Sequence, residues 1–510
     1  MLRPANLAPL AAFLVTASPA LDAQPHLAVA ELPAPAAAAS AVGSSLARDP
    51  DGVVWLTWLE TSSESTALRF ATRRPADASW SEPSTIASGA NWFVNWADFP
   101  ALTAGGGGRA TAVWFVNNPA PPAGPSASHD HHGPGYRAFL SSTIDAGRTW
   151  SPPAPLTRES NSVEFVSLAN LADGRVLAAW LDGRAKQNGA GAQRLYTRVV
   201  GSAGPDTLVD ASVCDCCQTA LTAFPDGTAL LAYRGRTADE VRDIRVTRFR
   251  GRAWDEPRPL AADDWRINAC PVNGPQLASD GGRVAAAWFT AADHEPRVLA
   301  SFSPDAGARF LQPLRLSDAK PAGRVATALL RDGAVLVAWV DVAGVLWLRR
   351  VTPEFSAAEP LALTVPGTAR VKGFPRLALL RDYLGGREPA QLLVTFTADA
   401  APTLRTLLVT IPEAELLEAE RNCDCAPTPA QLRGYSFRGQ LVGVDLATAT
   451  LQVKHPEVPG VLPEGMRAFR VAPELAAAAG QPGRQFLARI EQRDTAWWLF
   501  DLRFLVNAAR

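Results

Sequence analysis

The chain has 510 residues, of which 47% are hydrophobic and 19% are charged, so it can bury a substantial core and is not a disordered polymer. Its 49 basic and 50 acidic residues nearly cancel. This balance disfavours polyanion binding driven by net charge, and no nucleic-acid partner is expected. The length exceeds that of one compact domain and predicts either a large repeat fold or two domains.

The N-terminus has the pattern of a secretory signal peptide. Arg3 precedes an apolar run from Leu7 to Ala17 and a small-residue exit near Ala23, so we assign residues 1–23 to the signal peptide. The sequence contains no later stretch of 18 apolar residues, and no transmembrane segment is expected. The mature protein is therefore predicted to be periplasmic or secreted.

Short runs that end in an aromatic residue recur seven times, often after an Asp-Gly turn. They are Val53 to Trp58, Thr111 to Trp114, Val176 to Trp180, Ala229 to Tyr233, Val284 to Trp288, Val335 to Trp339 and Leu392 to Phe396. Each interval between the aromatics also holds three further strand-like runs separated by turn residues. Four short strands per repeat are typical of a propeller blade. Residues 38–411 are therefore predicted to form an all-β, seven-bladed propeller whose first strands line a central channel.

Two turns share the pattern Ser/Thr-x-Asp-x-Gly-x-x-aromatic, at Thr143 to Trp150 and at Ser303 to Phe310. In such a turn the carboxylate can accept backbone N–H bonds and glycine permits a positive φ. The pattern resembles the Asp-box of sialidase-like propellers, where it is a structural element. Because those propellers commonly have six blades, a six-bladed fold is the alternative to the seven repeats counted here.

Polar residues occupy comparable places near the start of several predicted inner strands. They are Asn95, Asp98, Glu164 and Asn273. Such groups either line a ligand site at the channel or bind water at strand ends, and the sequence leaves both interpretations open.

Four of the six cysteines lie near the starts of two neighbouring inner strands: Cys214, Cys216, Cys217 and Cys270. Cys216 and Cys270 each precede an Asp-Gly turn by ten residues, so we expect the four to meet at one mouth of the channel. Strand alternation would place Cys214 and Cys216 on one face. Converging thiolates suit Cu(I) or Zn(II), and Asp215 or Asn273 could add a ligand. The alternative is a set of disulfides, which an even cysteine count in an exported protein ordinarily indicates.

A dense charged cluster follows the fourth aromatic repeat. It comprises Tyr233, Arg234, Arg236, Glu240, Arg242 and Asp243. Arginines bind carboxylates bidentately, and a tyrosine with a glutamate base is the nucleophile of sialidases. An internal ion-pair network that orders a loop is the other interpretation.

Several of these segments, including those around Asp98, Cys214 to Thr219 and Cys270 to Pro275, are similar to a group of bacterial exported propellers commonly labelled exo-α-sialidase. The resemblance implies a glycoside hydrolase of sialidase type. In that interpretation Tyr233 of the charged cluster, or another tyrosine, would be the nucleophile, with Glu240 as its base and Arg234, Arg236 or Arg242 as the clamp for a glycan carboxylate. The Arg-Ile-Pro-like motif that usually precedes the first blade is absent from the sequence.

After residue 411 the repeat pattern ends. Residues 412–430 are assigned to a linker that contains Cys423 and Cys425, and residues 431–510 alternate as about five short strands, which predicts a small β-barrel. The run from His455 to Phe469 resembles periplasmic copper chaperones of the CusF type. That resemblance implies a Cu(I) site with His455 and Met466 as candidate ligands. The linker cysteines Cys423 and Cys425 could add soft donors if the linker folds back, and the alternative for them is a disulfide or a thiol pair without metal.

Two separate segments thus indicate soft-metal chemistry, and we predict an exported propeller that binds copper, or alternatively zinc, in periplasmic copper handling. Its partner would be a metal ion or a periplasmic copper protein. A sialidase-type hydrolase acting on a glycan is the first alternative. A non-catalytic propeller that docks another exported protein, with structural disulfides, is the second.

Overall fold

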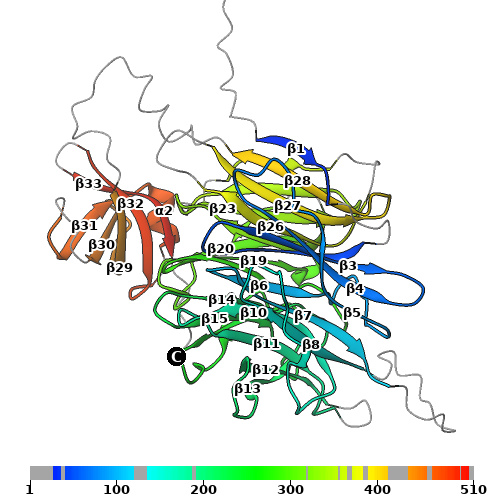
Figure 1. The fold of residues 1–510 in the computed structure, drawn as a ribbon. Helices are drawn as coiled ribbons and strands as arrows, with labels where there is room; N and C mark the ends of the chain where they lie inside the picture. The colour runs from blue at the N-terminus through cyan, green and yellow to red at the C-terminus, as the bar shows by residue number, and fades with distance from the viewer. Residues whose placement is uncertain are drawn as a thin grey trace, which may run out of the picture.

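Among the described residues of the computed structural model, regular secondary structure is almost entirely β-strand. The described residues are 27–35, 41–119, 135–186, 191–317, 320–353, 357–364, 370–382, 389–411, 435–455, 462–479, 481–493 and 496–504. Their strands form seven four-stranded antiparallel sheets and one closed barrel (Figure 1). The predicted seven-bladed propeller followed by a small five-stranded barrel is confirmed.

The first four blades follow the chain without interruption. Blade 1 comprises β2 (Val42–Arg48), β3 (Val54–Thr61), β4 (Thr66–Arg73) and β5 (Ser84–Gly89); blade 2 comprises β6 (Ala101–Gly105), β7 (Arg109–Asn117), β8 (Tyr136–Thr143) and β9 (Ala154–Pro155). Blade 3 comprises β10 (Val163–Asn170), β11 (Val176–Asp182), β12 (Gln193–Val199) and β13 (Thr207–Val213); blade 4 comprises β14 (Ala220–Ala223), β15 (Ala229–Arg234), β16 (Ile244–Phe249) and β17 (Arg258–Pro259). Each blade pairs its strands in sequence order.

The last three blades complete the ring. Blade 5 comprises β18 (Gln276–Asp280), β19 (Arg283–Thr290), β20 (Arg297–Ser303) and β21 (Leu314–Arg315), with the short 3-10 helix η1 (Ala292–His294) after β19; blade 6 comprises β22 (Pro321–Leu329), β23 (Val335–Asp341), β24 (Leu346–Val351) and β25 (Leu361–Ala362). Blade 7 comprises β26 (Val371–Arg381), β27 (Ala390–Ala398), β28 (Leu404–Ile411) and, as its outermost strand, β1 (Ala28–Leu32).

The strand β1 closes the ring, and it lies ahead of the propeller start predicted at residue 38. It pairs antiparallel with β28, from Ala28 opposite Thr410 to Leu32 opposite Thr406, and Glu31 forms an ion pair with Arg405. The segment carries neither the terminal aromatic nor the Asp-Gly turn of the other repeats, so nothing in the repeat pattern marks it as part of a blade.

The recurrent aromatic residues form the core between blades. All seven lie on the second strand of a blade and are at most 2% exposed: Trp58, Trp114, Trp180, Tyr233, Trp288, Trp339 and Phe396. Residues of all seven first strands line a cavity of about 1000 Å³ along the axis. The first strands therefore line the channel as predicted. The second strand of each blade, which carries the aromatic residue, lies one position further from the channel.

The turns after β8 and β20 place each glycine against the preceding blade. Asp145 accepts hydrogen bonds from the backbone N–H of Thr149 at 3.0 Å and from the hydroxyls of Thr149 and Thr143. These bonds lower the pKa of Asp145 to about 2. Gly147 has φ +82°, and a Cβ atom there would strike the ring of Phe70 in blade 1. Each turn therefore fixes the distance between two blades.

We expect Gly147→Ala and Gly307→Ala to lower the free energy of unfolding by roughly 2 to 4 kcal/mol, since a left-handed alanine is combined with a forced contact in a packed core. A Cβ at Gly307 would lie 2.5 Å from a methyl carbon of Leu230. Gly174 is the matched control, because it has the same φ of +82° with nothing within 4 Å. Gly174→Ala should lower the free energy of unfolding only by the cost of the left-handed backbone conformation, about 1 to 2 kcal/mol. Equal losses in urea denaturation for all three variants would contradict the interpretation.

The C-terminal strands form a barrel in the order β29-β30-β31-β33-β32. They are β29 (Tyr435–Asp445), β30 (Thr450–His455), β31 (Gly465–Arg470), β32 (Gln485–Arg493) and β33 (Ala496–Phe504), with the helix α2 (Pro473–Ala478) after β31. The barrel has its own hydrophobic core, which includes Leu451, Phe469 and Ile490. Residues 1–23 and 412–430, predicted as signal peptide and linker, lie outside the described residues.

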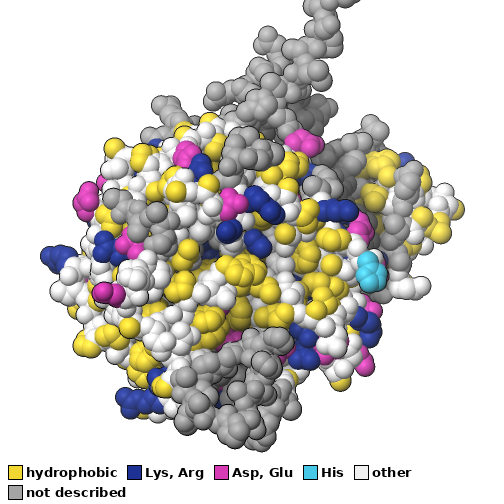
Figure 2. Space-filling view, turned by 90° about the vertical axis from the view of Figure 1, so that its right-hand side faces the viewer, with side chains coloured by type: hydrophobic (Ala, Val, Ile, Leu, Met, Phe, Trp, Pro, Cys, Tyr) yellow, Lys and Arg dark blue, Asp and Glu magenta, His cyan; other side chains and the backbone are white. Residues whose placement is uncertain are grey.

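The surface mixes charges of both signs. In Figure 2, Lys and Arg side chains lie interspersed with Asp and Glu among hydrophobic and uncharged groups, in agreement with the near-zero net charge. Among the described residues, no helix has both the length and the apolar character needed to cross a bilayer.

Candidate functional site

The cysteine-rich segment forms the connection between two blades. The strand β13, outermost in blade 3, ends at Val213, and residues 214–219 turn across to β14, innermost in blade 4. The backbone N–H of Cys214 donates to the carbonyl of Arg234 at 3.0 Å. Because the segment is a turn and not a strand, the predicted alternation fails: Cys214 is fully buried, whereas Cys216 is half-buried.

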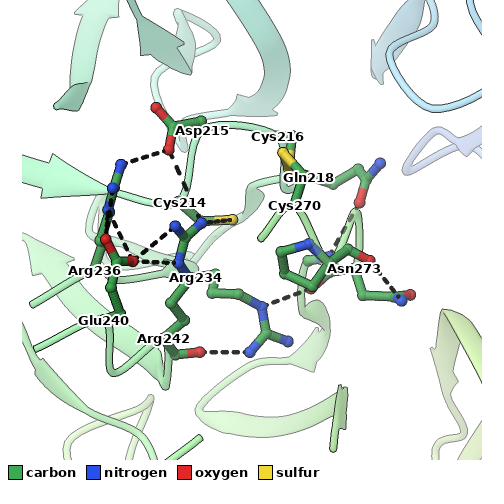
Figure 3. The surroundings of a disulfide bond; sticks show 12 residues. Cys214, Asp215, Cys216, Gln218, Arg234, Arg236, Glu240, Arg242, Cys270 and Asn273 are labelled. Atoms are coloured by element: carbon green, nitrogen blue, oxygen red, sulfur yellow. Dashed lines mark hydrogen bonds and ion pairs between the residues drawn. A yellow bond between two sulfur atoms is a disulfide. The ribbon is translucent and has the colours of Figure 1, made fainter. Parts of the chain in front are cut away.

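All four of the predicted cysteines converge at this turn, but not as four thiols. Cys216 and Cys270 form a disulfide with a Cα–Cα distance of 6.0 Å, and Cys214 and Cys217 are free and buried. The sulfur atoms of Cys214, Cys216 and Cys217 all lie within 4.8 Å of one another. The structure therefore offers two thiols beside a disulfide in place of the four thiolates that the sequence suggested. Figure 3 shows one of them, Cys214, beside the Cys216–Cys270 disulfide.

The environment of Cys214 favours the thiolate. Burial alone would raise its pKa, but the thiol of Cys217, the backbone N–H of Cys216 and the positive charges of Arg234 and Arg242 lower it below the ordinary value. A guanidinium nitrogen of Arg242 lies 3.7 Å from the Cys214 sulfur. Burial and the neighbouring Cys214 raise the pKa of Cys217. The surroundings therefore favour the thiolate at Cys214 and the protonated thiol at Cys217.

Three members of the predicted charged cluster, Arg236, Glu240 and Arg242, form an ion-pair network beside Cys214. Glu240 pairs with Arg236 at 2.6 Å and with Arg242 at 2.8 Å, and these arginines lower its pKa. Asp215 pairs with Arg236 at 2.8 Å and with Lys186 at 2.6 Å. Figure 3 shows Arg236, Glu240 and Arg242 on one side of Cys214 and the disulfide on the other. Asp215 is thus neutralised by cations and not available as a metal ligand.

Tyr233 does not face Glu240, so the proposed sialidase nucleophile and base are not brought together. Its hydroxyl donates to Asp210 at 2.7 Å, and the ring is fully buried. Burial and the Asp210 carboxylate raise the pKa of Tyr233 far above its ordinary value. Tyr233 lies on a strand, where consecutive side chains point to opposite sides. Its own side points into the core between blades 3 and 4.

Arg234 is also unavailable as a carboxylate clamp. Its guanidinium donates to the backbone carbonyls of Asn273, Arg242 and Phe289 at 2.6 to 2.9 Å, and the side chain is 1% exposed. Asp243 has a similar structural role, since its carboxylate accepts the backbone N–H groups of Asp264 and Trp265. The bonds of both residues hold the backbone beneath the cysteine turn.

The polar residues predicted near the inner strands fix irregular backbone in the next blade. Asp98 accepts the N–H of Phe165 at 2.9 Å, and Asn273 accepts the N–H of Arg324 at 2.7 Å. Both donors have positive φ, at 52° and 56°, and lie at bulges in β10 and β22. This repeated device explains why polar residues recur at one depth in the sequence.

The remaining two predicted channel residues are also bonded within the protein. Asn95 accepts the N–H groups of Ala97 and Asp98, which closes a tight turn. Glu164 accepts a hydrogen bond from Ser162 at 3.3 Å, and burial raises its pKa to about 7 although the nearby Lys186 opposes the shift.

One residue that joins these segments was not among the predicted site residues. Gln218 donates to the carbonyl of Ala97 at 2.8 Å and accepts the N–H of Gly274 at 3.1 Å. It connects the cysteine turn to two other blades, and its position directly after Cys217 was the only signal that the sequence offered.

The barrel does not assemble its candidate ligands. His455 is 3% exposed and packs edge-on against Phe469, whereas Met466 is 68% exposed. They lie on neighbouring strands, with His455 opposite Gly465 and Lys454 opposite Met466, so alternation sends the two side chains to opposite faces of the barrel wall. Cys423 and Cys425 lie outside the described residues.

No family model matches the sequence, and no curated protein matches it. Similar solved structures include the BP39L lectin from Burkholderia pseudomallei, with 11% identity, a TM-score of 0.49 and coverage of 72% of this chain and 99% of the lectin. They also include the Hadza microbial sialidase Hz136, with 11% identity, a TM-score of 0.41 and coverage of 73% of this chain and 66% of the sialidase.

A third similar structure is the Trypanosoma rangeli sialidase in complex with the inhibitor DANA, with 10% identity, a TM-score of 0.38 and coverage of 88% of this chain and 69% of that one. The chain thus spans just under two thirds of the length of Hz136. The assignment of a propeller rests on the seven sheets themselves.

Proposed function

We propose that the propeller binds one Cu(I) ion through the thiolates of Cys214 and Cys217 and takes part in copper handling outside the cytoplasm. The observation that carries the proposal is that these two buried sulfurs are free of disulfide and lie within 4.8 Å of each other. Two sulfurs that share one ion at about 2.3 Å each lie at most roughly 4.6 Å apart. The pair is therefore close enough to share an ion with little movement.

The donor set favours Cu(I) over Zn(II). Structural zinc takes four ligands, and the described cluster supplies two thiols because the disulfide occupies Cys216 and Cys270. Cu(I) is a soft ion that thiolates select. Two thiolates with one monovalent cation leave a net charge of −1. The guanidinium of Arg242 at 3.7 Å offsets that charge in a site without bulk water.

Two further features support the setting of the proposal. A disulfide is expected in an oxidising compartment and is rare in the cytosol, which agrees with the predicted export. The five-stranded barrel offers the type of fold expected from its resemblance to CusF-type chaperones, although His455 and Met466 face opposite sides of its wall. We assign metal binding to the propeller turn and infer that the turns at Asp145 and Asp305 are structural Asp-boxes.

The test is anaerobic Cu(I) titration of the full mature chain against a chromophoric Cu(I) chelator. We expect one Cu(I) per chain and at least about a tenfold loss of affinity in Cys214→Ser and in Cys217→Ser, since each removes one of two thiolate ligands. The matched control is the double variant Cys216→Ser/Cys270→Ser, which keeps the buried pair and should keep one Cu(I).

Binding of less than one Cu(I) by the wild-type chain, or unchanged affinity in both single variants, would overturn the proposal. A metal-free protein in which all cysteines are oxidised would instead favour the non-catalytic propeller with structural disulfides. Zinc bound with equal stoichiometry in the disulfide-bonded protein would show that further ligands join the pair.

A further inference from the structure

The two cysteine pairs differ sharply in their access to solvent. Cys214 and Cys217 are 0% and 1% exposed, whereas Cys216 is half-buried and Cys270 is exposed. The exposed member ends a stretch from Arg266 in which most residues are exposed. A reduced pair thus lies in the interior directly beneath an accessible disulfide.

The sulfur of Cys216 connects the pairs. It is bonded to Cys270 and lies within 4.8 Å of both Cys214 and Cys217. The sulfurs of Cys214 and Cys217 also lie within 4.8 Å of each other. Thiol–disulfide exchange proceeds by attack of a thiolate on a disulfide sulfur, and every sulfur needed for two successive attacks is present in one turn and its partner loop.

We propose that this cluster is a thiol–disulfide relay that passes two electrons from the buried pair to an external disulfide at the surface. In the first step the Cys214 sulfur attacks the Cys216 sulfur. The Cys214–Cys216 bond forms, the Cys216–Cys270 bond breaks, and Cys270 leaves as a thiolate that solvent can protonate. The exposed sulfur is the one released because Cys216 is the member of the disulfide that clusters with the two buried sulfurs.

In the second step Cys217 loses its proton and attacks the Cys214 sulfur. The Cys214–Cys217 bond forms and Cys216 leaves as a thiolate that takes up a proton. Two thiols and one disulfide have become one disulfide and two thiols, so the rearrangement is balanced without any outside reagent. Its effect is to move the disulfide inward and the reducing pair outward.

The outward pair can then reduce an external disulfide, either a small molecule or a disulfide on an exposed segment of another exported protein. Cys270 attacks one sulfur of that disulfide and releases the first external thiol. Cys216 then attacks the Cys270 sulfur, releases the second external thiol and restores the Cys216–Cys270 bond. The external disulfide gains two electrons, and the chain ends with two disulfides until an external thiol reduces it.

The relay rests on the same cysteines as the proposed copper site, so the experiment uses the metal-free full chain in the presence of a chelator. The probe is 5,5′-dithiobis(2-nitrobenzoate), an aromatic disulfide whose reduction is followed by colour. We expect wild-type protein to release two equivalents of the aromatic thiol. Peptide mapping after acid quenching and alkylation should then find a Cys214–Cys217 disulfide together with Cys216–Cys270.

The decisive variant is Cys216→Ser/Cys270→Ser, which leaves the buried pair intact and removes its route to the surface. Release should slow by about tenfold or more, because a fully buried thiol then reacts only through local opening. Cys214→Ser should release no second equivalent. Thermal unfolding of each variant, followed by circular dichroism, verifies that it is folded.

Equal rates in wild type and in the double serine variant would overturn the relay, as would the absence of a Cys214–Cys217 disulfide after the reaction. Because no copper is present, either outcome leaves the copper titration unaffected. Conversely, a chain that exchanges disulfides but binds no Cu(I) retains the relay and loses the copper site.

Discussion

Arg234→Met is expected to destabilise the propeller by about 3 to 5 kcal/mol, since buried carbonyls that lose a charged donor keep their full desolvation cost. Arg234 is 1% exposed and donates to three backbone carbonyls from blades 4 and 5. Its guanidinium also lies 4.8 Å from the ring centroid of Trp265. Methionine fills a similar volume but leaves all three carbonyls without a donor.

The measurement is the free energy of unfolding in urea, with Arg234→Lys as an intermediate variant that keeps the charge and loses the fork of donors. The control is Arg250→Ala. Arg250 and Asp255 form an ion pair at 2.8 Å with side chains 55% and 43% exposed, and an exposed pair is worth only about 0 to 1 kcal/mol. A loss below about 1 kcal/mol in Arg234→Met would show that water or backbone shifts satisfy the three carbonyls.

The repeat sequence specified the blades because each blade depends on its own local pattern. Trp180 and Trp288 are each preceded by aliphatic residues, most of them valine or alanine, that pack between sheets. The same kind of run recurs on the second strand of the other blades. The outermost strand of blade 7 was missed for the opposite reason. Ala28–Leu32 acquires its role only through pairing with a strand about 380 residues away, and no local signal carries that information.

The candidate site was predicted in part. Equal spacing from the Asp-Gly turns correctly indicated that Cys216 and Cys270 meet, since the spacing reports the same depth in adjacent blades. Which sulfurs bond was not predictable, because it depends on the path of the turn after β13, where Cys214 and Cys217 face inward and Cys216 does not.

The hydrogen-bond partner of Tyr233 is a second feature that the sequence could not predict. Its hydroxyl meets Asp210, which is 23 residues earlier and on the outermost strand of the preceding blade. The nearer Glu240 was the obvious candidate by sequence distance, yet it is held by two arginines. Contacts between blades follow from packing angles that the one-dimensional pattern does not contain.

Asp98 should make the stability of the propeller fall as the pH rises. Burial raises the pKa of this carboxyl to about 8, even though the hydroxyl of Tyr136 at 2.5 Å and the N–H of Phe165 favour the charged form. A group whose pKa is raised on folding is protonated in the folded state while the unfolded chain has already lost the proton. Its contribution is therefore complete below the ordinary aspartate pKa and is lost as the pH rises through about 8.

We expect the free energy of unfolding to decrease between pH 5 and pH 8 by up to about 1.4 kcal/mol per pH unit from this group alone. Asp98→Asn keeps an oxygen that can accept from Tyr136 or Phe165 and cannot ionise, so it should flatten the dependence. Glu164, whose pKa burial raises to about 7, acts in the same direction, and Cys214, whose pKa is lowered, acts in the opposite one. The difference between wild type and Asp98→Asn removes the contribution of Cys214, and Glu164→Gln isolates that of Glu164, whose charge also raises the pKa of Asp98.

The measurement is urea denaturation at closely spaced pH values for wild type, Asp98→Asn and Glu164→Gln. Parallel curves for wild type and Asp98→Asn would show that Asp98 is ionised throughout, and the bulge at Phe165 would then be held by a carboxylate. If the two curves converge at high pH, as expected, the protonated carboxyl of Asp98 is the form that holds the bulge at Phe165 at low pH. In that case ionisation of Asp98 lowers the stability of the propeller because burial penalises the charge, although the hydrogen bonds that join blades 2 and 3 at this point favour the charged form.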